Sequence, residues 1–204
     1  MCRGIHNTDR SVQSRTFYLF QKFVKDLRSE ITPEFVPTLI DSIRDLLVPV
    51  VVLSDTENSS GRSSPATPSD AFEDAVSSAT IFDSQLHLYE SLGILISLLF
   101  ATPTEHAALL QSVVQPLLDD MSGVLSTAAS AAASGNLLPI LRVHHVISAL
   151  GAIARGYPEY PKVPTPDFVL PPIAVFQSMA QAMLVALDTL NTFKSIRSAV
   201  SKQP

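Results

Sequence analysis

The sequence is poor in residues that cross-link a chain or hold a metal. Among its 204 residues it has one cysteine, Cys2, and no tryptophan. A single cysteine excludes a disulfide within the chain and any metal site built from several thiolates. We therefore expect a protein of a reducing compartment.

Signals for secretion and for membrane spanning are also missing. The opening residues, MCRGIHNTDRS, contain no apolar core of a signal peptide. The most apolar run, SLGILISLLF (residues 91–100), is too short to cross a bilayer. The pattern predicts a soluble, intracellular protein with no membrane insertion.

Motifs for catalysis and for cofactor binding are absent as well. The sequence has no G-x-S-x-G turn and no glycine-rich phosphate loop. His87 and Glu90 lie one helical turn apart, but a single pair supplies too few ligands for a metal. His144 and His145 are adjacent, so on a helix they point about 100° apart. We expect no enzyme activity, no metal and no cofactor.

Charge is scarce and unevenly placed. Charged residues make up 16% of the chain, and the net charge of −5 argues against a dedicated basic nucleic-acid-binding module. Residues 1–30 nevertheless carry six basic against three acidic residues, whereas residues 41–120 carry twelve acidic against two basic residues. Such separation favours polar, salt-dependent partners, although both patches could also be plain solvated surface.

Apolar residues are abundant, at 46%, and they recur with a helical period almost everywhere. We find no strand alternation. The period and the capping residues predict six helices, over residues 9–29, 33–48, 82–100, 103–130, 136–155 and 172–200. A Ser/Pro-rich stretch at residues 54–70 has almost nothing to bury and is expected to be disordered.

The order of these helices predicts an all-α protein, an α-solenoid of HEAT-like antiparallel helix pairs, about three in number. Without the inserts each pair is about 40–50 residues long, which is the HEAT period. The expected division is a helix pair at 1–53, a disordered insert at 54–80, a pair at 81–135, and a pair at 136–204 that contains a Pro-rich loop at 157–172. A compact helical bundle is the structural alternative. Neither end carries a polar capping repeat, so we expect an interior part of a longer solenoid.

The first predicted helix has two distinct faces. Its apolar arc consists of Val12, Thr16, Phe17, Leu19, Phe20, Phe23, Val24 and Leu27. Its basic arc consists of Arg15, Lys22, Lys25 and Arg28. The apolar arc must be buried against a neighbour. The basic arc is either solvated surface or a binding surface for an anionic partner.

Four stretches, in this order, carry a family resemblance: SRTFYLFQKFVKDLR (residues 14–28), QLHLYESLGILISLL (85–99), HHVISALGAIARGYPE (144–159) and ALDTLNTFKSIRSA (186–199). The short segment IRDLL (43–47) adds to them. Together they resemble the tRNA exportins, the exportin-T branch of the importin-β (karyopherin) family, most closely the fungal forms. The resemblance covers nearly the whole chain except the Ser/Pro-rich inserts.

The resemblance implies a HEAT-repeat receptor that binds tRNA together with Ran-GTP, passes nuclear pore proteins, and shuttles between nucleus and cytoplasm. Because one carrier accepts many tRNAs, the contacts should be to phosphates, and Arg15, Lys22, Lys25 and Arg28 are the candidate contacts. Two alternatives stay open: a HEAT-type scaffold that binds only protein, and another karyopherin with a different cargo.

Overall fold

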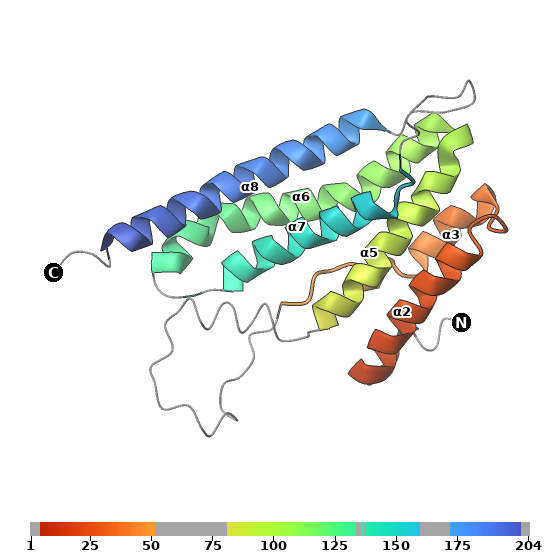
Figure 1. Ribbon diagram of the computed structural model, residues 1–204, viewed down its shortest axis with the longest axis horizontal. Helices are drawn as coiled ribbons and strands as arrows, with labels where there is room; N and C mark the ends of the chain where they lie inside the picture. The colour runs from red at the N-terminus through yellow and green to blue at the C-terminus, as the bar shows by residue number, and fades with distance from the viewer. Residues whose placement is uncertain (1–4, 52–80, 134–135, 137, 160–171, 201–204) are drawn as a thin grey trace.

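The computed structural model describes residues 5–51, 81–133, 136, 138–159 and 172–200. Figure 1 shows the elements, which in chain order are α2 (Arg10–Asp26), η1 (Pro33–Phe35), α3 (Val36–Asp41), η2 (Arg44–Leu46), α5 (Ile81–Ser97), η4 (Leu98–Ala101), α6 (Pro103–Ala133), α7 (Leu138–Gly156) and α8 (Ile173–Val200). No β-strand occurs in the described ranges, and the all-α prediction is confirmed. The expected insert at 54–80 and most of the Pro-rich loop lie outside the described residues.

Helix ends follow local capping chemistry. The Asp9 carboxylate accepts hydrogen bonds from the backbone N–H groups of Ser11 (2.8 Å) and the next residue (3.3 Å), so α2 begins at Arg10. The Asn136 side chain likewise accepts from the Leu138 N–H at 3.1 Å, at the start of α7. These short polar side chains accept hydrogen bonds from the first N–H groups of each helix, which have no partner inside the helix.

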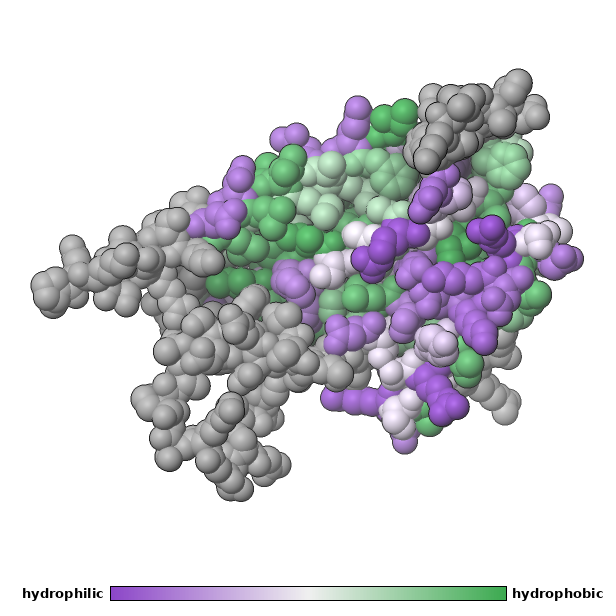
Figure 2. Space-filling view, viewed as in Figure 1, coloured by the Kyte–Doolittle hydropathy of each residue, from purple (hydrophilic) through white to green (hydrophobic). Residues whose placement is uncertain are grey.

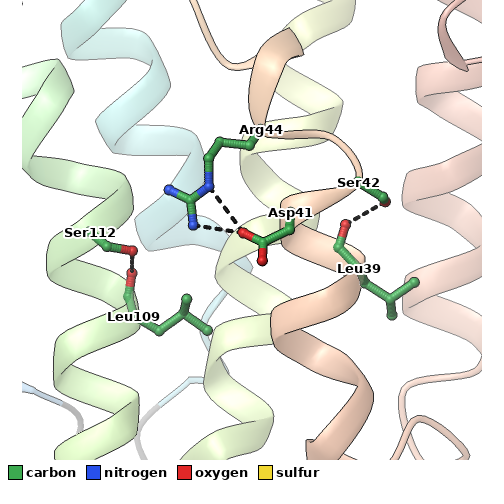
Figure 3. Close-up of polar contacts among 6 residues, drawn as sticks. All are labelled: Leu39, Asp41, Ser42, Arg44, Leu109 and Ser112. Carbon is green, nitrogen blue, oxygen red and sulfur yellow. Dashed lines mark hydrogen bonds and ion pairs between the residues drawn. The ribbon is translucent and has the colours of Figure 1, made fainter.

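The predicted continuous helix over residues 33–48 is wrong: η1, α3 and η2 occupy this range as short pieces. Pro37 has no N–H group, so it cannot donate to the Pro33 carbonyl four residues earlier. The Val36 N–H takes that carbonyl instead, in the tighter 3₁₀ pattern. Helical geometry stops again near Ser42, whose hydroxyl donates to the Leu39 carbonyl at 2.7 Å, as Figure 3 shows.

The longer helices pack in two layers. In one layer α5 lies between α2 and α7 and packs extensively on both, and in the other α6 packs on α8 (Figure 1). The layers meet mainly where α6 packs on α7, the most extensive contact between consecutive helices. This arrangement confirms a helical-repeat solenoid. The division into pairs at 1–53, 81–135 and 136–204 stays a prediction.

Two glycines allow α5 and α7 to approach closely. A Cβ atom built on Gly93 would lie 2.0 Å from the Ile153 carbonyl oxygen, and one on Gly156 would lie 2.2 Å from the Glu90 carbonyl oxygen. Real Cβ atoms do not come so near to backbone. The close crossing of α5 and α7 therefore depends on the absence of a side chain at Gly93 and Gly156, in addition to the packing of the surrounding core.

A buried glutamine of α5 holds the irregular segment after η2. Gln85 is 4% exposed, its amide donates to the carbonyls of Leu46 (2.9 Å) and Val48 (3.0 Å), and its oxygen accepts from the Val50 N–H (3.0 Å). One turn later, the Tyr89 hydroxyl donates to the Leu47 carbonyl at 2.6 Å. These bonds satisfy backbone groups that have no helical partner.

Two helices are long and apolar enough to cross a membrane by length and composition. In the first, Phe82–Ala101, 56% of the apolar window is buried, as expected for a helix between two neighbours. In the second, Ile173–Asn191 of α8, only 17% is buried. Core helices of soluble proteins pass the same test, and the absence of membrane insertion stays a prediction. The unusual feature is the exposed apolar face of α8.

Candidate nucleic-acid interface on α2

Helix α2 presents three stripes along its length. The stripe that packs on α5 contains Phe17, Phe20, Gln21 and Val24, all of them buried. A basic stripe runs along one side of it and an apolar stripe along the other. The Ser14 and Ser84 hydroxyls, which are hydrogen-bonded to each other, connect α2 to α5 near the start of both helices.

The apolar arc is only partly buried, which corrects the expectation that a neighbour covers all of it. Val12, Leu19 and Leu27 are 41%, 51% and 38% exposed, and Thr16 and Phe23 are half-buried. The reason is geometric: α5 covers only the arc centred on Phe17 to Val24. The remaining members form an exposed apolar stripe that borders the basic residues, because Leu19 lies four positions after Arg15 and three before Lys22.

The four predicted phosphate contacts are all exposed, but they differ in position. Arg15, Lys22 and Lys25 lie on one side of α2. Arg28 lies beyond the end of the helix, which stops at Asp26. The structure therefore brings three of the four onto one helical stripe.

Ion pairing divides these cations further. Lys25 Nζ lies 2.6 Å from Glu90 Oε1 on α5, and the two side chains are 49% and 19% exposed. Among the described residues, no carboxylate lies within ion-pair distance of Arg15, Lys22 or Arg28. The charge of Lys25 is thus largely committed inside the protein, whereas Arg15 and Lys22 direct theirs to solvent.

Tyr18 lies within the basic stripe and was not among the predicted site residues. It follows Arg15 by three positions and precedes Lys22 by four, so the three side chains share one face of the helix. The residue is 51% exposed, and its ring meets the His87 ring of α5 edge-on, with centroids 5.5 Å apart. An aromatic residue at this spacing between cations was the sequence signal that could have identified it.

The environment of His87 keeps it uncharged at neutral pH. Partial burial lowers the pKa of His87, Glu90 acts in the opposite direction, and Lys25 lowers it further. The surface therefore owes its positive charge to the α2 side chains and not to histidine. Figure 2 shows hydrophilic residues gathered where α2 and α5 lie, and hydrophobic residues gathered where α6, α7 and α8 lie.

The other histidines lie inside the helix packing. His106 is 4% exposed and its Nε2 lies 2.9 Å from the Tyr157 hydroxyl, while His145 is 3% exposed and stacks on Phe82 with centroids 3.7 Å apart. Burial lowers the pKa of His106, and burial followed by the neighbouring His144 lowers that of His145 to about 4. Within the described part of the chain, no group of three His, Cys, Asp or Glu side chains could hold a metal ion.

Comparison with known proteins identifies relatives along the whole chain. A family model described as Exportin-T matches residues 1–202. Exportin-T of Laccaria bicolor is 44% identical over 197 residues, covering 97% of this chain and 17% of that protein. Exportin-T of Coprinopsis cinerea and of Neurospora crassa are each 38% identical, covering 97% and 96% of this chain and 18% of each relative. The chain thus spans less than a fifth of the length of these relatives.

Proposed function

Because the chain belongs to the Exportin-T family, we propose that it forms part of a nuclear export receptor that binds tRNA together with Ran-GTP. Such a receptor passes nuclear pore proteins and shuttles between nucleus and cytoplasm. The family membership and the helical-repeat fold support this proposal. The receptor acts by binding and release, so we expect no catalysis from this chain.

The observation that carries the proposal to particular residues is the basic stripe of α2. A receptor for many different tRNAs must bind features that all of them share, and the phosphate backbone is the main one. Arg15 and Lys22 are exposed and have no carboxylate partner among the described residues. They are the two cations best placed to accept RNA phosphates.

The remaining two candidates contribute less directly. To bind a phosphate, Lys25 would have to break its short ion pair with Glu90. Arg28 lies in the turn after α2, so its position is less fixed relative to the stripe. We therefore assign Lys25 the role of orienting the stripe on α5 and Arg28 that of an additional phosphate contact.

The test replaces the matching segment of Laccaria bicolor Exportin-T with residues 1–202 of this chain. We expect the chimaera to retain tRNA in a filter-binding assay and to bind it more tightly with Ran-GTP. The intact relative is the matched control. A chimaera that folds and binds Ran-GTP but retains no tRNA would contradict the proposal.

A second candidate function is a scaffold for protein partners, or a karyopherin with another cargo. The exposed apolar residues of α8 favour it, because contiguous exposed apolar area marks protein interfaces. Ile173, Leu184 and Leu187 are 44%, 58% and 46% exposed. Under this alternative the chimaera would fail to bind tRNA, and apolar-to-polar changes on α8 would abolish partner binding.

A further inference from the structure

Tyr18 places an aromatic ring within the basic stripe of α2. Tyr18 is 51% exposed and lies three positions after Arg15 and four before Lys22, whereas the equally exposed Leu19 beside it belongs to the neighbouring apolar stripe. Of the two, only Tyr18 carries an aromatic ring into the basic stripe. A half-exposed aromatic ring gains only part of the stability that full burial would give it. A ring placed among cations is therefore better suited to a ligand that is both aromatic and anionic.

The contact with α5 fixes the ring without covering it. The rings of Tyr18 and His87 are inclined at 72°, with centroids 5.5 Å apart. This edge-to-face geometry is a favourable one for aromatic pairs, and it restricts the rotation of the tyrosine. His87 is itself half-buried on a helix held by the core, so it provides a rigid support. A ring held in this way binds with little loss of conformational entropy.

Resting on the proposed function, we propose that Tyr18 stacks on an unpaired nucleobase of the bound RNA, while Arg15 and Lys22 contact the phosphates beside that base. Unpaired bases stack on aromatic side chains, whereas bases within an RNA duplex are already stacked and paired. Side chains three and four apart on a helix have Cβ atoms about 5–6 Å from each other. One nucleotide can therefore touch the ring and its flanking cations together.

The stripe thereby acquires a preference that phosphate contacts alone cannot give. Arg15 and Lys22 attract any RNA, paired or unpaired, because phosphates carry no sequence or pairing information. Tyr18 adds affinity only where the RNA offers an unstacked base. Because every base has an aromatic face, the preference is for unpaired nucleotides and not for a particular base.

The experiment uses the Exportin-T chimaera with Ran-GTP and two RNA ligands, a tRNA and a blunt, fully paired RNA duplex of similar length. Three single variants are compared: Tyr18→Leu, Tyr18→Phe and Lys22→Gln. Phe35→Leu is the matched control, because Phe35 is 64% exposed but lies on η1, outside the basic stripe. Affinity is measured over a range of salt concentrations.

We expect Tyr18→Leu to lower affinity for tRNA by about 5- to 100-fold, to leave duplex binding unchanged, and to keep the salt dependence of tRNA binding. Tyr18→Phe keeps the aromatic face, so its affinity should stay within roughly twofold. Lys22→Gln should weaken both ligands and make the salt dependence shallower. Phe35→Leu should change neither.

The failures of the two proposals are distinguishable. If Lys22→Gln behaves as expected but Tyr18→Leu leaves tRNA affinity unchanged, the stacking proposal is overturned and the phosphate proposal stands. If Tyr18→Leu weakens tRNA and duplex equally, or Tyr18→Phe is as weak as Tyr18→Leu, the ring does not act by stacking on an unpaired base. If the folded chimaera binds no RNA, both proposals fall.

Discussion

The crossing of α5 and α7 gives the sharpest test of the packing. Gly93→Ala places a methyl group 2.0 Å from the Ile153 carbonyl oxygen and 2.9 Å from the Gly156 Cα atom. Both neighbours are backbone atoms of a helix, so they cannot move aside as a flexible side chain can. The two helices must separate by more than about 1 Å to reach normal van der Waals contact.

The magnitude follows from two opposing terms. Overpacking a core costs typically 1–3 kcal/mol, and a backbone clash of this depth belongs at the upper end, about 3 kcal/mol. Alanine has a higher helix propensity than glycine, and this alone would raise the free energy of unfolding by about 1 kcal/mol. We expect Gly93→Ala to lower the free energy of unfolding by about 2 kcal/mol.

Two other helical glycines provide the control. A Cβ atom on Gly123 or Gly151 would meet nothing within 4 Å. Alanine at either position should raise the free energy of unfolding by about 0.5–1 kcal/mol. Denaturant unfolding of the 204-residue chain, followed by circular dichroism, measures all three variants. If Gly93→Ala is as stable as Gly123→Ala, the close approach of α5 and α7 is refuted.

Three further predictions concern the core and the surface. Gln85→Leu leaves backbone groups of residues 46–50 without partners, so it should lower the free energy of unfolding in denaturant titrations by about 1–3 kcal/mol or more. An unchanged free energy would show that Gln85 does not hold this segment. The pKa of His145 is about 4, below the ordinary value of 6.5, so between these two pH values the unfolded state binds more protons than the folded state. The free energy of unfolding should therefore fall as the pH drops from about 6.5 to 4. His145→Leu should flatten this pH dependence, and an equally steep slope would contradict the role of His145. The exposed apolar face of α8 should make the chain self-associate. The double variant Leu184→Gln, Leu187→Gln should be a monomer when measured by analytical ultracentrifugation. A wild-type chain that is already monomeric at high concentration would argue against this face as a contact.

The sequence predicted the long helices because their apolar period is regular over many residues. It failed over residues 33–48, where the period continues but Pro33 and Pro37 stand four apart. This spacing removes the helical hydrogen bond between them, so the break could have been read from the sequence. The period alone records which side chains are apolar and says nothing of whether the backbone can close its bonds.

Contacts between distant parts of the chain could not be predicted in the same way. The basic arc was visible on a helical wheel, but its division into free and paired cations depends on Glu90 of α5. The partial exposure of the apolar arc depends on how much of α2 is covered by α5. The need for glycine at position 93 depends on Gly156 lying opposite it on α7. Each is set by tertiary packing and leaves no local pattern.

Binding of RNA phosphates by the exposed cations of α2 can be tested by removing their charge. Arg15→Gln combined with Lys22→Gln removes two positive charges and leaves the buried stripe intact, so stability should hardly change. The charge-matched control combines Arg44→Gln with Arg155→Gln, which lie outside α2 and are also exposed.

The decisive measurement is the slope of log affinity against log salt concentration for tRNA and the Exportin-T chimaera with Ran-GTP. We predict that the α2 double variant binds all tRNAs more weakly and that its slope is shallower by about 1.4–1.8, the loss of two phosphate contacts. The control variant should keep the original slope. Unchanged affinity and slope in the α2 double variant would contradict phosphate binding by these cations and leave the stripe as solvated surface of the solenoid.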